Sequence, residues 1–402
     1  MKHDISQIIS YVIENINPQK TLAAALQKTH FNNGRIFVIA IGKAAWVMAD
    51  TARKVLGKKI TQGMVITKYG HLKGEIENFD LYEAGHPLVD ENTLKATQIA
   101  WQLTDDLKEN DSVIFLLSGG GSALFELPVG SLDQLQCISS QLIRSSASIV
   151  EINTIRKRLS RVKGGKFARH CQPARVYNFV LSDVIGNRLD MVASGPTVND
   201  SSTMKQAEEL LARYHLENVK LEDTVNDLTN VENQVIGDVS ILAQCAEEIC
   251  QRLGYQSKVV RTDLTCSDIE AARLLTGMAH CHQSSDESLA LIYSGEITTE
   301  VTGSGLGGRN QQLALRCAEG LRKTRRTTII ALGSDGTDGP TDAAGGYVNS
   351  YSWRKSRKKQ IDIDSYLKDN DSYHALEKLN QLIITGPTNS NLNDLYLVLI
   401  KR

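Results

Sequence analysis

The stretch Val113-Ile-Phe-Leu-Leu117 runs directly into Ser118-Gly-Gly-Gly-Ser-Ala123, and this junction indicates the class of fold. An apolar run that ends at a glycine turn is typical of a buried parallel strand that leads into a helix. Ligands of open parallel sheets bind beyond the carboxyl ends of such strands, and residues without a Cβ let amide groups close around a phosphate or carboxylate. We therefore expect an anion-binding loop rather than a plain surface turn, formed by Ser118, Gly119, Gly120, Gly121 and Ser122.

Similar apolar runs recur at the ends of longer amphipathic stretches, and this rhythm predicts an α/β fold of parallel strands joined by helices. After two opening helices, we expect strands at 35–41, 63–67, 81–84, 112–117 and 176–181. A second series is expected at 234–237, 257–261, 289–293, 327–332, 381–385 and 395–400. A polar, acidic stretch at 216–233 lies between the two series of strands. We therefore expect two domains, residues 1–232 and 233–402.

The composition favours a small-molecule partner. The 402 residues include 45 Lys and Arg against 46 Asp and Glu, a net charge of -1, which leaves no positive field to attract nucleic acid or an anionic membrane. The seven cysteines form no Cys-x-x-Cys pair, so neither a disulfide framework nor a zinc ribbon is expected. The sequence has no signal-peptide core and no apolar run of membrane-spanning length, so we expect a cytoplasmic protein.

A second glycine loop, Gly303-Ser-Gly-Leu-Gly-Gly308, precedes Arg309 and a helical pattern. It formally matches the Gly-x-Gly-x-x-Gly motif of dinucleotide sites, which also need an acidic residue about 20 residues further on to hold the ribose. Asp335 comes later than that, inside another glycine turn. An arginine at a helix start can instead reach a bound phosphate. Besides Arg309, the candidate binding residues of this region are Glu296, Gly307, Gly308 and Asn310.

Lys43 follows the first expected strand, in Ile41-Gly-Lys-Ala-Ala45. A lysine at such a turn can touch an anionic ligand as a point charge, whereas a merely exposed lysine at a helix start would be slightly unfavourable against the helix dipole. Acidic residues follow several strands as well. Phosphoryl transfer from a nucleotide needs a divalent cation held by one or two carboxylates, and the candidates are Asp183, Asp335 and Asp338. Asp338 can equally be a turn or helix-capping residue.

The stretch 152–169 has an apolar stripe at helical spacing, and the basic residues outside it include Arg156, Lys157, Arg158, Arg161, Lys163 and Lys166. Such a pattern usually indicates a solvated basic helix face, which is what we expect here. Gly164-Gly165, which break the helix between two lysines, leave open that its end approaches a ligand.

Seven segments, in order along nearly the whole chain, carry a resemblance to a known family. They are Ile41-Gly-Lys-Ala-Ala45, Ser118-Gly-Gly-Gly-Ser-Ala-Leu124, Ile152-Asn-Thr-Ile-Arg156 with Leu159-Ser-Arg-Val-Lys-Gly-Gly165, Ser182-Asp-Val184 with Ala193-Ser-Gly-Pro-Thr197, Gly307-Gly-Arg-Asn-Gln311, Ser334-Asp-Gly-Thr-Asp-Gly-Pro-Thr-Asp-Ala-Ala344 and Gly386-Pro-Thr-Asn-Ser-Asn-Leu-Asn-Asp-Leu395. Together they resemble the class II glycerate 2-kinases, which have an N-terminal glycerate-kinase domain and a C-terminal MOFRL domain.

The resemblance implies ATP-dependent phosphorylation of the 2-hydroxyl of D-glycerate, which gives 2-phosphoglycerate and uses Mg²⁺. It implies a Rossmann-like parallel sheet plus a smaller α/β MOFRL domain, with the active site in the cleft between them. Lys43 and Arg309 match the family's paired cationic positions, and two such charges would stabilise the reacting phosphoryl group. The loop Ser118–Ser122 would then hold phosphate or the substrate carboxylate, while Asp183, Asp335 or Asp338 would help hold the cation.

Two departures from the family pattern, at 184–192 and 386–391, leave another small 2-hydroxy acid open as acceptor. Two other functions also stay open. One is an NAD(P)H-dependent hydroxypyruvate reductase, which would use Gly303–Gly308 as its dinucleotide loop. The other is a non-catalytic sensor of a phosphorylated sugar acid, which would need the anion loops without the metal carboxylates. Assembly into a homo-oligomer is a further open possibility.

Overall fold

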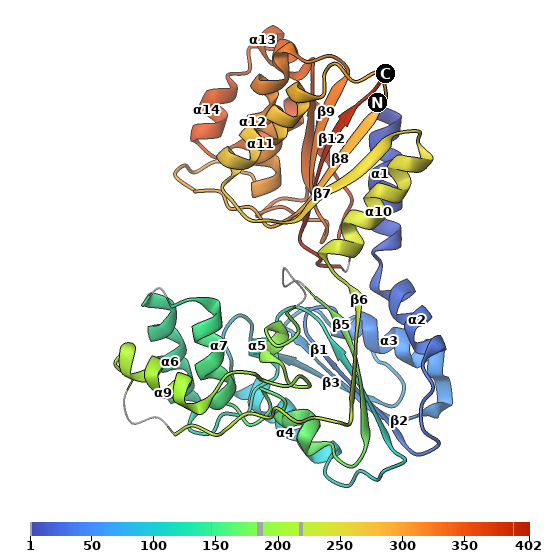
Figure 1. The fold of residues 1–402 in the computed structure, drawn as a ribbon, viewed down its shortest axis with the longest axis vertical. Coiled ribbons are helices and arrows are strands. Elements are labelled where there is room, and N and C mark those ends of the chain that lie inside the picture. The colour runs from blue at the N-terminus through green and yellow to red at the C-terminus, as the bar shows by residue number, and fades with distance from the viewer. Residues whose placement is uncertain (1, 146, 183–187, 217–219, 389) are drawn as a thin grey trace. The chain divides into compact units, whose positions relative to one another are not determined.

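Figure 1 shows the computed structural model, which describes residues 2–145, 147–182, 188–216, 220–388 and 390–402. The chain divides into two compact units, of which the first is Pro18–Ile236 and the second joins the N-terminal residues through Asn17 to Gly237–Arg402. The sequence places the division at 232/233 and assigns the N-terminal helix to the first domain. That helix, α1 (Lys2–Asn15), buries Ile5, Ile8 and Val12, and it belongs with the second unit.

The first unit is built on a six-stranded sheet in the order β3-β2-β1-β4-β5-β6. Its strands are β1 (Ile36–Ile41), β2 (Ile60–Lys68), β3 (Phe79–Ala84), β4 (Ser112–Leu117), β5 (Arg175–Leu181) and β6 (Val231–Gly237). The pairs from β3 through β5 are parallel, and the order is that of doubly wound nucleotide-binding sheets. The strand expected at 234–237 was assigned to the second series. That assignment is wrong, because β6 pairs at the edge of this sheet beside β5.

In the described part of the first unit, eight α-helices connect or flank these strands. They are α2 (Pro18–Lys28), α3 (Ala45–Leu56), α4 (Glu91–Leu103), α5 (Gly121–Leu124), α6 (Leu132–Arg144), α7 (Ile149–Arg158), α8 (Lys166–His170) and α9 (Met204–Arg213), with short 3-10 turns η1 (Gly57–Lys59) and η2 (Val192–Ser194). The helix α7 begins with a capping box, because Ser148 accepts from the Glu151 amide while the Glu151 carboxylate accepts from the Ser148 amide.

The basic stretch that includes α7 differs from the expected solvated face. Arg158 and Lys163 have no exposed side-chain surface, and Lys157 is buried as well. Lys163 Nζ lies 2.7 Å from Glu126 Oε2, and Lys157 Nζ lies 2.9 Å from Asp200 Oδ1. The prediction of a solvated face is wrong, because buried carboxylates elsewhere in the chain supply counter-charges that a local pattern does not reveal.

The second unit contains a six-stranded sheet in the order β11-β10-β9-β12-β8-β7. Its strands are β7 (Gln256–Leu264), β8 (Leu289–Gly295), β9 (Thr327–Gly333), β10 (Gly345–Asn349), β11 (Leu382–Ile383) and β12 (Asp394–Ile400). Only β7 and β8 pair in parallel, and the other pairs are antiparallel. The expectation of parallel strands therefore holds for the first sheet and is wrong for most of the second.

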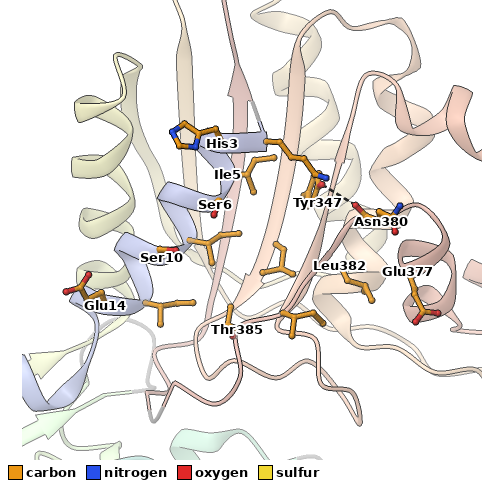
Figure 2. A pocket seen from close by; sticks show the side chains of 15 residues that line it. His3, Ile5, Ser6, Ser10, Glu14, Tyr347, Glu377, Asn380, Leu382 and Thr385 are labelled. Carbon is orange, nitrogen blue, oxygen red and sulfur yellow. Dashed lines mark hydrogen bonds between the residues drawn. The ribbon is translucent and has the colours of Figure 1, made fainter.

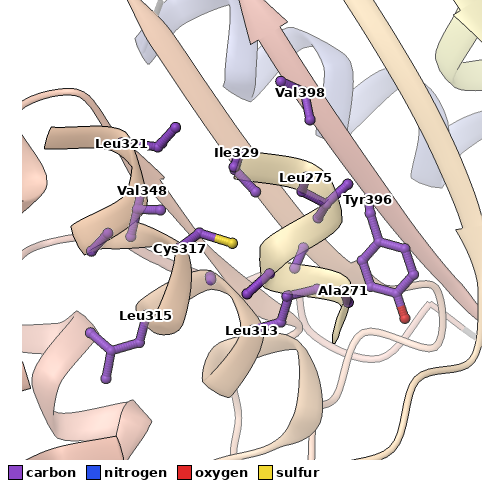
Figure 3. Packing of buried hydrophobic residues seen from close by; sticks show 14 of the residues in the cluster. Ala271, Leu275, Leu313, Leu315, Cys317, Leu321, Ile329, Val348, Tyr396 and Val398 are labelled. Carbon is purple, nitrogen blue, oxygen red and sulfur yellow. The ribbon is translucent and has the colours of Figure 1, made fainter. Parts of the chain in front are cut away.

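The central strand β12 is buried along its whole length. Tyr396, Val398 and Ile400 belong to the core that Figure 3 shows, together with Leu275 and Leu313 of two helices. Helices α1 and α10 lie together in Figure 1, away from α11 and α12. The helices here are α10 (Val239–Arg252), α11 (Asp268–Cys281), α12 (Arg309–Gly320), α13 (Ser352–Lys358), α14 (Ile363–Lys368) and α15 (Ser372–Lys378), with a 3-10 turn η3 (Leu321–Lys323). Across the described ranges, no helix has the length and apolar character needed to cross a membrane.

Candidate active site

The candidate site of the first unit lies where the order of its strands reverses. Strand β1 pairs with β2 on one side and with β4 on the other, so the loops that follow β1 and β4 leave the same edge of the sheet in opposite directions. In doubly wound sheets this switch point is where ligands bind. Lys43 follows β1 and the glycine loop, Ser118–Ser122, follows β4. The two meet, because the Lys43 amide donates to the Gly119 carbonyl oxygen at 2.9 Å.

Ser118 holds these two loops together. Its hydroxyl donates to the Ile41 carbonyl oxygen at 3.1 Å and accepts from the Ala44 amide at 3.1 Å. Gly42 must lack a side chain, since its φ is +113° and a Cβ there would lie 2.3 Å from Ser118 Oγ. The hydroxyl of Ser118 is thus committed to the backbone, which indicates a structural contribution from this predicted binding residue.

The rest of the glycine loop keeps its amide groups available. Gly120 adopts a left-handed conformation with φ +88° and precedes the short helix α5. Within the described parts of the chain, the amides of 119–122 donate no hydrogen bond to another backbone oxygen. Buried amides are normally paired, so a partly buried loop with four open donors is suited to an anionic ligand. Ser122 adds a hydroxyl, which lies 3.4 Å from Ser194 Oγ.

His86 is a residue of this site that the sequence did not single out. It follows β3, and its imidazole packs against the glycine loop: a Cβ built on Gly120 would lie 2.9 Å from His86 Cδ2, 3.0 Å from His86 Nε2 and 3.6 Å from Lys43 Cγ. Burial lowers the pKa of His86 from its ordinary value of 6.5, and the charges of Lys43, Lys68 and His71 lower it further. The only local sequence signal was Gly85-His86-Pro87 at the end of an expected strand.

Arg309 lies in the second unit and is paired with two carboxylates. Its Nε and Nη2 donate to the two oxygens of Asp394 at 2.6 and 3.2 Å, and its Nη1 donates to Glu296 at 2.5 Å. Burial alone would lower the pKa of Arg309, but Asp394 and Glu296 outweigh burial and raise it. Burial raises the pKa of Asp394 to about 6, against the opposing effect of Arg309. Asp394 was part of a quoted motif but had no predicted role, and it holds the Arg309 guanidinium in place.

Asp338, predicted as a metal ligand, lies at the start of α12. Its carboxylate accepts from the backbone amides and the side-chain amides of Asn310 and Gln311 at 2.8 to 3.2 Å. Burial raises its pKa, although these four donors oppose the shift. Gly308 fits closely here, because a Cβ on it would lie 2.3 Å from Asp338 Cγ. The geometry favours helix capping over metal binding for Asp338, and it assigns Asn310 a partner within the protein.

The second glycine loop packs against the segment 369–372. The amides of Thr302, Gly303, Ser304 and Leu306 donate to side-chain oxygens of that segment, and the Gly305 amide donates to the Asp369 carbonyl. A Cβ on Gly307 would lie 2.3 Å from Ser372 Oγ. These glycines permit a close approach of two chain segments, and the amide donors of Gly303 and Gly305 are already used.

Two metal candidates remain, Asp335 and Asp183. Asp335 is half-buried, and its Oδ1 accepts from the Thr337 amide at 3.0 Å. Asp183 lies outside the described residues. Among the side chains that the structure does describe, no three His, Cys, Asp or Glu residues gather in a way that could hold a metal ion.

A cavity of about 970 Å³ opens elsewhere in the second unit, between α1 and the edge of the sheet (Figure 2). Its lining includes Ile5, Ser10, Tyr347 and Leu382. None of the predicted site residues lines this cavity. It is therefore separate from the candidate site.

Comparisons with known proteins match two family models to the chain. The family described as "Domain of unknown function (DUF4147)" matches residues 4–230, and the MOFRL family matches 289–394. A D-glycerate 2-kinase of Thermotoga maritima is 46% identical over 98% of this chain and 97% of its own length. A crystal structure of a glycerate kinase from the same organism superimposes with a TM-score of 0.95 at 45% identity, covering 99% of both chains. A protein of Agrobacterium vitis named "Putative hydroxypyruvate reductase" is 34% identical over 91% of this chain and 87% of its own length.

The matches to both domains and the extent of the likeness confirm the resemblance drawn from the seven motifs. The chain belongs to the class II glycerate 2-kinases, a family of phosphotransferases.

Proposed function

We propose that this protein transfers the γ-phosphoryl group of ATP to the 2-hydroxyl of D-glycerate, which yields ADP and 2-phosphoglycerate. The observation that carries the proposal is the group at the switch point of the first sheet, where an unpaired lysine meets a loop with open amide donors. Lys43 makes no side-chain hydrogen bond or ion pair within the described residues. A cation and amide donors without partners are suited to bind and neutralise a phosphate or carboxylate.

In the proposed mechanism, the glycine loop binds an anionic group of a substrate through the amides of 119–122. Lys43 places its charge on the same group, and Arg309 supplies a second charge to the transferring phosphoryl oxygens. This chemistry requires mainly positioning and charge stabilisation. Asp394 and Glu296 fix the guanidinium of Arg309, so it needs little reorganisation during the reaction.

The proposal includes Mg²⁺, which would neutralise phosphate charge when bound with the nucleotide. A nucleotide-bound Mg²⁺ needs only one or two protein carboxylates. Asp335 fits that requirement among the described residues, because one of its oxygens is engaged and the other accepts no hydrogen bond. We also propose that the protein is cytoplasmic, in keeping with seven free cysteines.

The reductase alternative depends on Gly303–Gly308 as a dinucleotide loop. The amides of 302–306 already donate to 369–371, so this loop has few donors left for a pyrophosphate. The strand order of the first sheet is shared with dinucleotide-binding folds and does not separate the two functions. The turn after β1, however, carries one glycine where the dinucleotide motif has three.

The test is an ADP-release assay on the purified full chain with Mg-ATP and D-glycerate. We expect ADP release that requires glycerate, and a product that enolase converts without a phosphoglycerate mutase, because enolase acts on the 2-phosphate isomer. A parallel assay follows NADH oxidation with hydroxypyruvate. NADH oxidation without ADP release would establish the reductase, and ligand binding without either reaction would establish the sensor. Binding of the ligand without metal by Asp335→Asn would also favour the sensor.

A further inference from the structure

The loops that follow β1, β3 and β4 bring one imidazole to the candidate site. Parallel strands end at the same edge of their sheet, so residues far apart in sequence meet there. Lys43 and His86 approach Gly120 from two of these loops, at 3.6 Å and 2.9 Å from the point where its Cβ would stand. The Nε2 edge of the imidazole therefore faces the loop whose amides are open.

The ring of His86 is half-buried and has no hydrogen-bond partner in the described part of the chain. Other histidines of the first unit are engaged: His71 Nδ1 lies 3.3 Å from the Lys43 carbonyl oxygen, and His170 Nε2 lies 3.0 Å from the Trp101 carbonyl oxygen. A half-buried imidazole without a partner, at the edge of an anion loop, can exchange a proton with a bound ligand.

We propose that His86 is the general base that accepts the proton of the acceptor hydroxyl during phosphoryl transfer. This assignment rests on the proposed function. The hydroxyl oxygen forms a bond to the γ-phosphorus while the bond from that phosphorus to the bridging oxygen breaks, and ADP leaves with the electron pair. The hydroxyl proton moves to Nε2 of His86, and the imidazolium later releases it to water.

The surroundings of His86 suit this task. The titratable groups that act on it are Lys43 from the loop after β1, Lys68 at the end of β2 and His71 from the loop after β2, and burial is the largest influence on its pKa. All four effects favour the neutral ring, so His86 is unprotonated and able to accept a proton at pH 7. Protonation of the ring at lower pH removes the base, so kcat/KM should fall as the pH falls through the pKa of His86, which lies below 6.5.

The first experiment replaces His86 by Gln and measures kcat, KM and their pH dependence with Mg-ATP and D-glycerate. We expect kcat to fall by about a hundredfold, the lower end of the range for a lost general base, with KM for ATP changed by less than about threefold. The acidic limb of the pH profile should disappear. His30→Gln is the matched control, because His30 is exposed in the loop before β1, at the opposite edge of the sheet. It should behave as wild type.

A second measurement does not depend on the folding of His86→Gln. Lys68→Gln removes one positive charge that lowers the pKa of His86, so the acidic limb of the kcat/KM profile should move to higher pH. A wild-type profile that shows no acidic limb at any pH at which the protein stays folded would overturn the assignment. So would a His86→Gln enzyme that keeps kcat within about threefold of wild type, or one whose kcat falls while the acidic limb stays. A wild type without glycerate-dependent ADP release would refute the proposed function itself.

Discussion

Replacing Lys43 by Ala separates the chemistry of the site from the stability of the fold. The side chain is exposed and forms no ion pair or hydrogen bond in the described part of the chain, so the free energy of unfolding should change by less than about 0.5 kcal/mol. Its Cγ approaches Gly120 to within 3.6 Å of the Cβ position. A charge about 4 Å from an anionic group contributes about 4 kcal/mol at an effective dielectric constant near 20. Part of this electrostatic energy already stabilises the bound substrate, so only the rest lowers the activation free energy.

We therefore expect Lys43→Ala to lower kcat by at least about a hundredfold, or about 2.7 kcal/mol of activation free energy. The assay is ADP release at saturating Mg-ATP and D-glycerate, with thermal unfolding measured in parallel. Lys54→Ala is the matched control. Lys54 lies on the helix α3 that follows Lys43, is 69% exposed and pairs only with Asp50 one turn away, so its loss should leave kcat unchanged. A Lys43→Ala enzyme with kcat within about threefold of wild type would show that the open cation has no part in the reaction.

Three further predictions follow from other contacts of the same chain. Lys163→Met should lower the free energy of unfolding by about 3–5 kcal/mol in a urea titration, because it leaves the carboxylate of Glu126, which is 1% exposed, without its partner; an unchanged midpoint would contradict this. Gly120→Ala should impair kcat more than stability, since the new Cβ would stand 2.9 Å from His86 at a φ of +88°. Gly57→Ala is the control for a substitution at positive φ, and an equal loss of kcat in this control would argue against a displaced imidazole. Asp394 has a folded pKa of about 6, above the ordinary 3.8, so the native state binds the extra proton between these values and stability falls by about 3 kcal/mol as pH rises through that window. Urea unfolding of wild type and Asp394→Asn from pH 4 to 7 should show a steeper fall in wild type than in the variant.

The sequence could predict Lys43 and the glycine loop as site residues because the pattern that indicates them lies within a few neighbouring residues. An apolar run followed by glycines predicts both the strand and the loop after it, and β4 has the predicted bounds, 112–117. Once β1 and β4 are both parallel strands, Lys43 and the glycine loop must leave the same edge of the sheet. His86 carries no comparable signal. It reaches Gly120 only because β3 pairs with β2, and strand order is not visible in one sequence.

Glycine was also the source of two errors. β10 was missed because Gly345 and Gly346 are typical of a turn, yet Gly345 is required where the strand approaches its neighbour: a Cβ there would lie 2.1 Å from the Ala331 carbonyl oxygen. The Gly303–Gly308 motif was assigned possible nucleotide contacts on its spacing. That spacing instead follows from close packing against 369–372, because Gly303, Gly305 and Gly307, at every second position, each meet an atom of that segment. Sequence alone does not distinguish a glycine that admits a ligand from one that admits another part of the chain.

The backbone donors make that distinction. Both glycine loops follow a strand and precede a helix, and both are rich in residues without a Cβ. In the loop 303–308 the amides of 303–306 find acceptors within the chain, and the N-terminus of α12 is capped by the carboxylate of Asp338. In the loop 118–122 the amides of 119–122 find none among the described residues. Since an unpaired, partly buried amide is costly unless a ligand or water satisfies it, the first loop has the donors that an anionic substrate requires.

The two cations, Lys43 and Arg309, also differ in whether they have a partner within the described residues, and this difference bears on their roles. Arg309 is held by Asp394 and Glu296, so its position is fixed before substrate arrives, and part of its charge is neutralised. Lys43 has no counter-ion in the described residues and a flexible side chain, so a bound anion is the first opposite charge it meets. The gain in electrostatic energy on binding is therefore larger at Lys43, whereas Arg309 offers directed hydrogen bonds with little reorganisation. If both act on one phosphoryl group, the loss of activity in the double Ala variant will be smaller than the product of the two single losses.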